Sequence, residues 1–147
     1  MPDRGKINNR ERAKQINDFS NLKYGSITPT DIDGLIEYHK NAYVIIEIKY
    51  NNAEMPPGQM WALERLTDDL EKSGKPTICI LANHNIDDPE KDVDVSNTIV
   101  IKYRRNKKWV ETEKCTTKQI IDQFLTTVEK NTTSLSFSQA WKKITRK

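Results

Sequence analysis

Two neighbouring stretches of β-forming residues, 30–37 and 43–49, carry charged side chains among apolar ones. The polar triplet at residues 39–41 lies between them and is typical of a tight turn, so the two stretches are expected to pair as a β-hairpin. The second stretch is β-branched or aromatic on both sides, which predicts a strand buried on both faces and central in its sheet. Charges on such strands are costly unless they are neutralised or used. The hairpin therefore constrains both the fold and the chemistry of the chain.

The rest of the pattern predicts an α/β fold with a mixed central sheet flanked by helices. Residues 7–19 favour a helix with Ile7, Ile16 and Phe19 on its buried face. Beyond the hairpin, the expected elements are a helix at 59–73 with Met60, Leu63, Leu66 and Leu70 on its apolar face, strands at 77–82, 98–103 and 108–112, a helix from Thr116 or Thr117 to Lys130 and a last short helix at 138–144. The order strand, helix, strand over residues 43–82 predicts a crossover between parallel strands.

The chain has 147 residues, which fits one domain with one core. We expect a single domain over residues 1–147, with its core at about 7–82 and a C-terminal elaboration at about 98–147. No apolar run approaches the ~20 residues that a membrane span needs, and residues 1–10 hold no signal-peptide core. These observations predict a cytoplasmic protein without a membrane partner.

Charge is unevenly distributed along a chain whose formal net charge is +3. One basic cluster falls on the turn expected between the strands at 98–103 and 108–112, and consists of Arg104, Arg105, Lys107 and Lys108. Basic clusters on a mildly basic protein fit a polyanion such as DNA, with phosphates gripped by the turn. A solvated turn explains the same cluster about equally well.

The hairpin register brings two carboxylates together. Side chains alternate across a strand, and a turn at residues 39–41 pairs Asp33 with Glu47 and leaves Asp31 near Lys49. Opposed Cβ atoms lie about 4.5–5.5 Å apart, and carboxylates that close repel unless a cation lies between them or one is protonated. Mg²⁺, which takes a few carboxylates and keeps several waters, fits such a site, and the backbone carbonyl of Ile48 is a further candidate ligand.

Lys49 supplies positive charge beside this site. A lysine next to a metal can hold a water nucleophile or stabilise the charge that develops on a phosphodiester under attack. From spacing alone, a surface salt-bridge cluster explains the three charged residues as well as a catalytic site does. The apolar character of the Glu47 strand favours the site.

Asp33, followed after about a dozen residues by Glu47-Ile48-Lys49, resembles the D…(D/E)xK signature of the PD-(D/E)XK nuclease superfamily. The expected order of elements from about Ile7 to Ala82 is similar to the αβββαβ core of that superfamily, which is the restriction-endonuclease-like fold. The segment before the acid reads Thr30-Asp31-Ile32-Asp33 and lacks the Pro-Asp pair that names the superfamily. Asp31 therefore stays a rival of Asp33.

The resemblance implies a role for each matching residue. Asp33 and Glu47 would bind one or two Mg²⁺ ions, and Lys49 would serve the nucleophile. Many members add a Glu on the first helix, for which Glu11 is the candidate, and some place a Gln at the start of the next helix, where Gln59 stands. The aromatic residue that follows this Gln in some subfamilies is replaced by Leu63.

These observations predict a Mg²⁺- or Mn²⁺-dependent DNA endonuclease of phage or mobile-element type, which hydrolyses phosphodiester bonds in a structure-directed way, at junctions, flaps or nicks, or with weak sequence specificity. Two alternatives stay open, a sequence-specific restriction endonuclease and a non-catalytic nucleic-acid-binding or inhibitor protein on the same fold. Many such enzymes act as dimers, so a homodimer is also open, as is the choice between DNA and RNA.

Three further residues are candidates for contacts with the substrate, and two of them, Tyr50 and Trp61, flank the expected site in sequence. Tyr50 and Trp61 are each able to stack on a base, although for Trp61 packing in the core is the favoured interpretation. His84 follows the strand at 77–82, where it would approach a phosphate or form only local hydrogen bonds.

Overall fold

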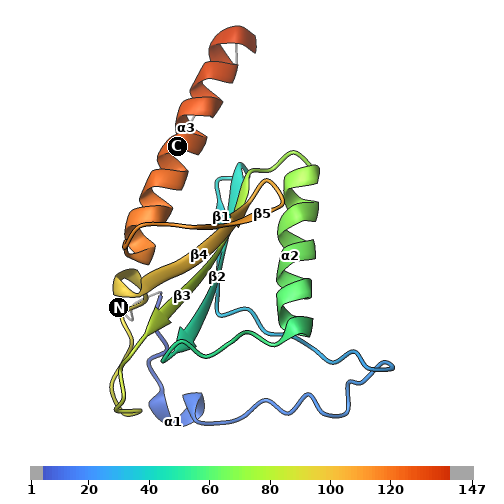
Figure 1. Cartoon of the computed structure of the whole chain (residues 1–147), viewed down its shortest axis with the longest axis vertical. Coiled ribbons are helices and arrows are strands. Elements are labelled where there is room, and N and C mark those ends of the chain that lie inside the picture. Colours follow the sequence, from blue (N-terminus) through green and yellow to red (C-terminus); the bar gives the residue numbers. More distant parts are fainter. Residues whose placement is uncertain (1–4, 140–147) are drawn as a thin grey trace. The chain divides into compact units, whose positions relative to one another are not determined.

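The structure, a computed structural model, describes the backbone of residues 5–139 and the side chains of residues 5–131. The chain divides into two compact units, Met1–Asp31 and Ile32–Lys147. The second unit has an α/β architecture built on a five-stranded mixed sheet, as the sequence predicted at the level of fold class (Figure 1).

Among its described residues, the second unit contains five strands, two α-helices and one 3-10 helix. Its elements are β1 (Gly34–Tyr38), β2 (Ala42–Tyr50), α2 (Pro57–Lys72), β3 (Thr77–His84), the short 3-10 helix η1 (Val95–Asn97), β4 (Ile99–Arg105), β5 (Lys108–Glu111) and α3 (Thr117–Gln139). The strands lie in the order β1-β2-β3-β4-β5, and only β2 and β3 run parallel. Two predictions are thus confirmed. The strand predicted after the hairpin turn, β2, lies in the interior of the sheet, and a helical crossover joins it to a parallel strand, β3.

The hairpin turn explains the register of β1 and β2. His39 and Lys40 have positive φ angles of 52° and 62°, and the Asn41 N–H donates to the Tyr38 carbonyl at 2.8 Å. Two successive residues with positive φ are typical of a type I′ turn, whose twist matches that of the paired strands. Asn41 adds a third loop residue, so Tyr38 pairs with Ala42 and Gly34 with Ile46, which is the register that the sequence predicted.

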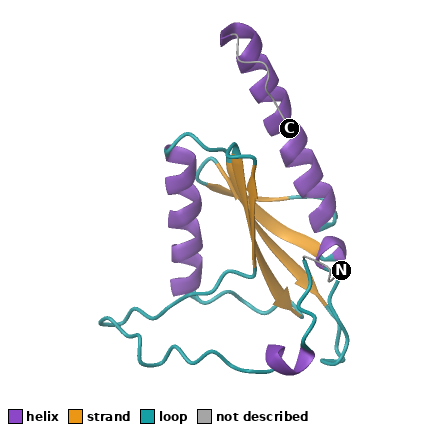
Figure 2. Ribbon diagram, turned by 180° about the vertical axis from the view of Figure 1, so that it is seen from behind, coloured by secondary structure: helices purple, strands orange, loops and turns teal. Residues whose placement is uncertain are grey.

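Two helices cover the two faces of the sheet (Figures 1 and 2). Ile120, Phe124 and Val128 of α3 pack on one face of the sheet. Leu63 of α2 packs on the other, against Ile45 and two further strand residues, with Met60 and Leu70 beside them. Because side chains alternate along a strand, each interior strand contributes to both cores. The site described below lies on the α2 face.

Helix α2 presents a slightly different face from the one expected. Its first residue is Pro57, a residue favoured at that position because its missing N–H would have no helical partner. Leu63 is 1% exposed, whereas Leu66 is 38% exposed and Thr67 is fully buried in its place. The Thr67 hydroxyl donates to the Leu63 carbonyl at 2.7 Å, which satisfies it inside the core. The prediction for Leu66 was wrong because the buried stripe advances by four residues after Leu63.

This difference predicts unequal costs for two leucine truncations. Leu63→Ala should lower the free energy of unfolding by about 2–5 kcal/mol, since it leaves a cavity in a core that cannot fully collapse. Leu66→Ala, the matched control on the same helix, should cost about 1 kcal/mol or less. Urea denaturation of both variants measures the two values. Equal losses would contradict the orientation of α2.

Over residues 5–31, the described part of the N-terminal unit, there is one short helix, α1 (Arg10–Ala13), which begins after an Asn9 side chain that accepts from the Arg12 N–H. The longer helix predicted over residues 7–19 is therefore wrong, and so is its buried face. Ile7 is 73% exposed and Ile16 is 90% exposed. Helices this short are marginal unless an apolar face packs, and α1 contains no buried residue.

Two further expectations meet the structure only in part. Two strands precede α2, one fewer than the αβββαβ core contains, because residues 51–56 form a turn and a loop. Helix α3 continues past the expected Lys130 to Gln139, and most of the short helix expected at 138–144 lies outside the described residues. Within the described part of the chain, no helix combines the length and apolarity that crossing a membrane requires.

Candidate metal and catalytic site

The site lies where β2 meets the beginning of α2. Glu47 and Lys49 occupy alternate positions on β2 and share the face that carries Ile45, which packs against α2. Gln59 stands in the first turn of α2 and reaches across to both of them. A strand, a tight turn and a helix N-terminus thus bring together three residues that the sequence singled out.

These three side chains form a closed ring of contacts. Lys49 Nζ lies 3.2 Å from Glu47 Oε2 and donates to Gln59 Oε1 at 3.0 Å. Gln59 Nε2 donates to the same Glu47 Oε2 at 2.8 Å. Each group therefore fixes the other two, and the ammonium group of Lys49 is held beside the carboxylate with its side chain only 14% exposed.

The second oxygen of the Glu47 carboxylate has no partner. Glu47 is 3% exposed, and its Oε1 is the only buried side-chain nitrogen or oxygen among the described residues that forms no hydrogen bond. Leaving such an acceptor unsatisfied costs about 1–3 kcal/mol, and more for a charged group, so native proteins rarely retain one without a use. This oxygen therefore keeps an unused capacity to accept a hydrogen bond or to bind a cation.

Asp33 lies on the neighbouring strand edge. It precedes β1 by one residue, and the register of Gly34 with Ile46, extended by one pair, places Asp33 opposite Glu47. Asp33 Oδ2 accepts from the Ile48 N–H at 2.7 Å. Because the N–H and C=O of one strand residue point to the same edge, the Ile48 carbonyl also lies on the Asp33 side of β2.

The pKa of Glu47 depends on its burial and on its three polar neighbours, Asp33, Lys49 and Gln59. Burial raises the pKa of the Glu47 carboxyl above its usual value, and the negative charge of Asp33 raises it further. The hydrogen bond and charge of Lys49, and the hydrogen bond from Gln59, act in the opposite direction without cancelling the rise in the pKa. A divalent cation would relieve this repulsion at the Glu47 carboxylate.

The raised pKa of Glu47 predicts how the stability of the metal-free protein depends on pH. The folded state holds its proton to higher pH than the unfolded state, so stability should fall as pH rises from the ordinary carboxyl value of 4.5 through the raised pKa. Glu47→Gln removes this contribution, and the variant should unfold at a higher temperature than wild type at pH 7 in EDTA, with the difference shrinking toward pH 4. Thermal unfolding across that range measures both. A variant less stable than wild type at pH 7 and equally pH-dependent would contradict the assignment.

The other acidic candidates lie in the N-terminal unit, which ends at Asp31. Glu11 is on α1, where its side chain is 85% exposed and pairs with Lys14 at 3.5 Å. Of the three acidic candidates Glu11, Asp31 and Asp33, Asp33 is the one that belongs to the same unit as Glu47 and lies beside it. In the described part of the chain no group of three or more His, Cys, Asp or Glu converges as a metal site, so a cation here would rely on two carboxylates, a carbonyl and waters.

The basic turn is less free than its sequence indicated. Arg104 donates to both Asp68 oxygens, at 2.9 and 2.7 Å, and Arg105 donates to Glu71 at 3.0 Å, so both arginines are engaged by α2. Asn106 and Lys107 form the turn itself, with positive φ angles, and Lys107 and Lys108 are exposed. Two of the four predicted DNA-binding residues therefore also hold the β4–β5 hairpin on the helix.

Asn83 is a site neighbour that the sequence did not single out. It lies opposite Lys49 in the parallel ladder, is 8% exposed, and its Oδ1 accepts from the Asn52 N–H at 2.6 Å. This bond fixes the turn at Asn51 and Asn52, which both have positive φ, between Lys49 and α2. Asn51 and Asn52, directly after an apolar strand, were the signal in the sequence for a turn at this place, because asparagine tolerates positive φ better than most residues.

Comparison of the chain with protein-family models, with curated proteins and with solved structures gave no match. What the chain does is therefore inferred from the arrangement of Asp33, Glu47, Lys49 and Gln59.

Proposed function

We propose that this protein is a Mg²⁺- or Mn²⁺-dependent DNA endonuclease that hydrolyses phosphodiester bonds with the residues around Glu47. The observation that carries the proposal is the buried, unpartnered Oε1 of Glu47 beside Asp33. A buried carboxylate oxygen without a donor, next to a second carboxylate, fits a hard cation better than it fits a structural salt bridge, which would satisfy both oxygens.

The donor set suits such a cation. Asp33 Oδ1 belongs to the residue before β1, Glu47 Oε1 and the Ile48 carbonyl belong to β2, and Mg²⁺ or Mn²⁺ prefers such oxygen ligands. A bound divalent cation supplies charge stabilisation for the phosphoryl oxygens and lowers the pKa of a water ligand. Asp33 is already anchored by the Ile48 N–H, so its carboxylate needs little reorientation to serve as a ligand.

Lys49 and Gln59 perform the remaining tasks. The Lys49 ammonium group, held at 3.2 Å from Glu47, orients the attacking water and offsets negative charge on the phosphoryl group as it is attacked. Gln59 accepts from Lys49 and donates to Glu47, so it keeps the two groups at a fixed separation. Such positioning matters because a small displacement of a reacting group is costly to the rate.

The fold supports the proposal at a coarser level. A hairpin, a helix and a parallel strand surround the site as they do in the restriction-endonuclease-like core that the sequence resembles. With two strands before α2, the chain would be a reduced member of that class. Residues 98–147 would then supply DNA contacts outside the core.

A cleavage assay tests the proposal directly. The full chain is incubated with plasmid, branched and single-stranded DNA in Mg²⁺, in Mn²⁺ and in EDTA. Cleavage of at least one substrate in the metals and none in EDTA is expected. Tight, salt-dependent binding of DNA without cleavage in any metal would instead assign the chain to the non-catalytic nucleic-acid-binding proteins.

A further inference from the structure

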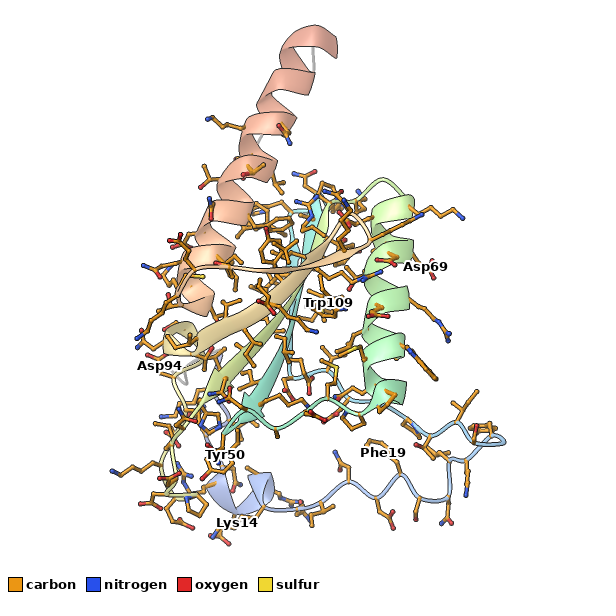
Figure 3. The ribbon with its side chains drawn as sticks, in the orientation of Figure 1. Lys14, Phe19, Tyr50, Asp69, Asp94 and Trp109 are labelled. Atoms are coloured by element: carbon orange, nitrogen blue, oxygen red, sulfur yellow. The ribbon has the colours of Figure 1, made fainter. Side chains whose placement is uncertain are left out.

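Two aromatic side chains stand at the carboxyl ends of the parallel strands, on the face of the sheet opposite the side chains of Glu47 and Lys49. Tyr50 follows Lys49 directly and is paired in register with His84, the last residue of β3. Their ring centroids are 5.4 Å apart at an interplanar angle of 47°. In open α/β sheets the carboxyl ends of parallel strands are the usual place for ligands, and Figure 3 shows Tyr50 at this end of the sheet.

Both rings are held in place by hydrogen bonds. The Tyr50 hydroxyl donates to Asp87 at 2.6 Å, and the His84 Nδ1 accepts from the Ile86 N–H at 3.1 Å. Despite these bonds Tyr50 remains 46% exposed. The pair is thus a rigid aromatic surface in contact with water, and it contributes little to either core.

We propose that Tyr50 and His84 form a stacking platform for an unpaired base of the DNA strand that is cut. The inference rests on the proposed nuclease function, whose substrate class it narrows to DNA with unpaired nucleotides, such as overhangs and flaps. Every base has a π-face, so aromatic side chains bind unpaired bases without selecting a sequence. Side chains alternate along a strand, so Tyr50 points to the face of β2 opposite Lys49, and a strand whose phosphate lies at Lys49 has to pass around the end of the sheet before one of its bases reaches Tyr50. A flexible single strand can make this turn, whereas a stiff duplex cannot.

The charge around the platform favours an unpaired base over a duplex. The loop that follows β3 carries acidic residues, namely Asp87, Asp88, Glu90, Asp92 and Asp94. These carboxylates repel phosphates, and a duplex would bring two phosphate backbones toward them. A single base turned away from its backbone is uncharged and is compatible with a platform whose Tyr50 hydroxyl is bound to Asp87.

Binding measured in EDTA tests the platform without cleavage. Fluorescence anisotropy gives the dissociation constants of the full chain for a hairpin duplex with a five-nucleotide overhang, for the same DNA with abasic overhang sites, and for the blunt hairpin. The overhang should bind about ten-fold more tightly than the other two, a change within the range that base–aromatic stacking produces. Equal affinities for all three DNAs would overturn the inference.

Substitutions then test whether the preference for the unpaired overhang depends on Tyr50. Tyr50→Ala should abolish the ten-fold preference, whereas Tyr50→Phe, which keeps the ring, should retain most of it. Trp61 is the matched control, because it is 55% exposed on α2, contrary to its expected place in the core. Trp61→Ala should leave the preference unchanged. If Tyr50→Ala retains the preference, or Trp61→Ala removes it, the platform is not at Tyr50.

The outcomes separate this inference from the proposed function. Preference for the overhang without cleavage in Mg²⁺ or Mn²⁺ would support the platform and refute the nuclease. Metal-dependent cleavage by a chain with no preference for unpaired bases would refute only the platform. The comparison of overhang with abasic DNA uses wild-type protein, so it stands even where a Tyr50 variant fails to fold.

Discussion

Lys49→Ala should lower the rate of metal-dependent DNA cleavage by about 1,000-fold, the range expected when a group that orients a nucleophile or stabilises transition-state charge is removed. Lys49 is the one cation in direct contact with Glu47 among the described residues, and its side chain is largely buried. Its loss therefore removes positive charge that no neighbouring group in the site replaces. Single-turnover cleavage at saturating protein measures the effect on the chemical step.

Two controls keep this result interpretable. Lys102→Ala removes another strand lysine, whose Nζ lies 4.8 Å from the Trp109 ring, and should change the rate by no more than about three-fold. Metal affinity has to be measured in parallel, because without Lys49 the pKa of Glu47 should rise further. A Lys49→Ala variant that cleaves at the wild-type rate with normal metal affinity would leave the site without its assigned nucleophile-orienting group.

Asp33→Asn should abolish the stabilisation of the protein by Mg²⁺ or Mn²⁺ and reduce cleavage by at least about 100-fold. The reason is that Asp33 supplies one of only two carboxylates at the site, and an amide neither repels Glu47 nor binds a hard cation well. Metal at 100 times its dissociation constant stabilises a folded protein by about 2.7 kcal/mol, which a thermal shift readily detects. Wild type should show this shift and Asp33→Asn should not.

Asp31→Asn is the matched variant, two residues earlier in the chain. Asp31 is exposed and belongs to the N-terminal unit, so its loss should leave both the metal-induced shift and the cleavage rate close to wild type. The reverse pattern, with activity lost in Asp31→Asn and kept in Asp33→Asn, would transfer the metal ligand to Asp31 and overturn the assignment made from the hairpin register.

The sequence predicted those parts of the fold in which local pattern and tertiary packing agree. The β1–β2 register followed from the turn at residues 39–41, and the parallel crossover followed from an apolar strand on either side of an amphipathic helix. Register alone placed Asp33 opposite Glu47. Gln59 was named through the resemblance to the nuclease superfamily, and in the structure its amide hydrogen-bonds both Lys49 and Glu47. The pairing of Asp33 with Glu47 was predictable because the two residues are close in sequence, so that few conformations of the connecting turn are possible.

Contacts between residues far apart in the sequence account for most of the differences between the predictions and the structure. Arg104 and Arg105 looked like free charge in sequence, and their engagement by Asp68 and Glu71 depends on how the β4–β5 hairpin packs on α2. Helix propensity over residues 7–19 did not produce a long helix, and none of the four residues of α1 is buried. The burial of Thr67 in place of Leu66 depends on the angle at which α2 meets the sheet.

The ring formed by Glu47, Lys49 and Gln59 has a consequence for the entropy lost when a ligand binds. Because the ring satisfies only Oε2 of the carboxylate, a cation bound at Oε1 would leave the contacts of Lys49 and Gln59 intact. A site preorganised in this way avoids the entropy of ordering side chains when the ligand arrives. The empty and loaded forms of the protein should then share nearly the same side-chain arrangement, and the buried oxygen acts as a fixed receptor.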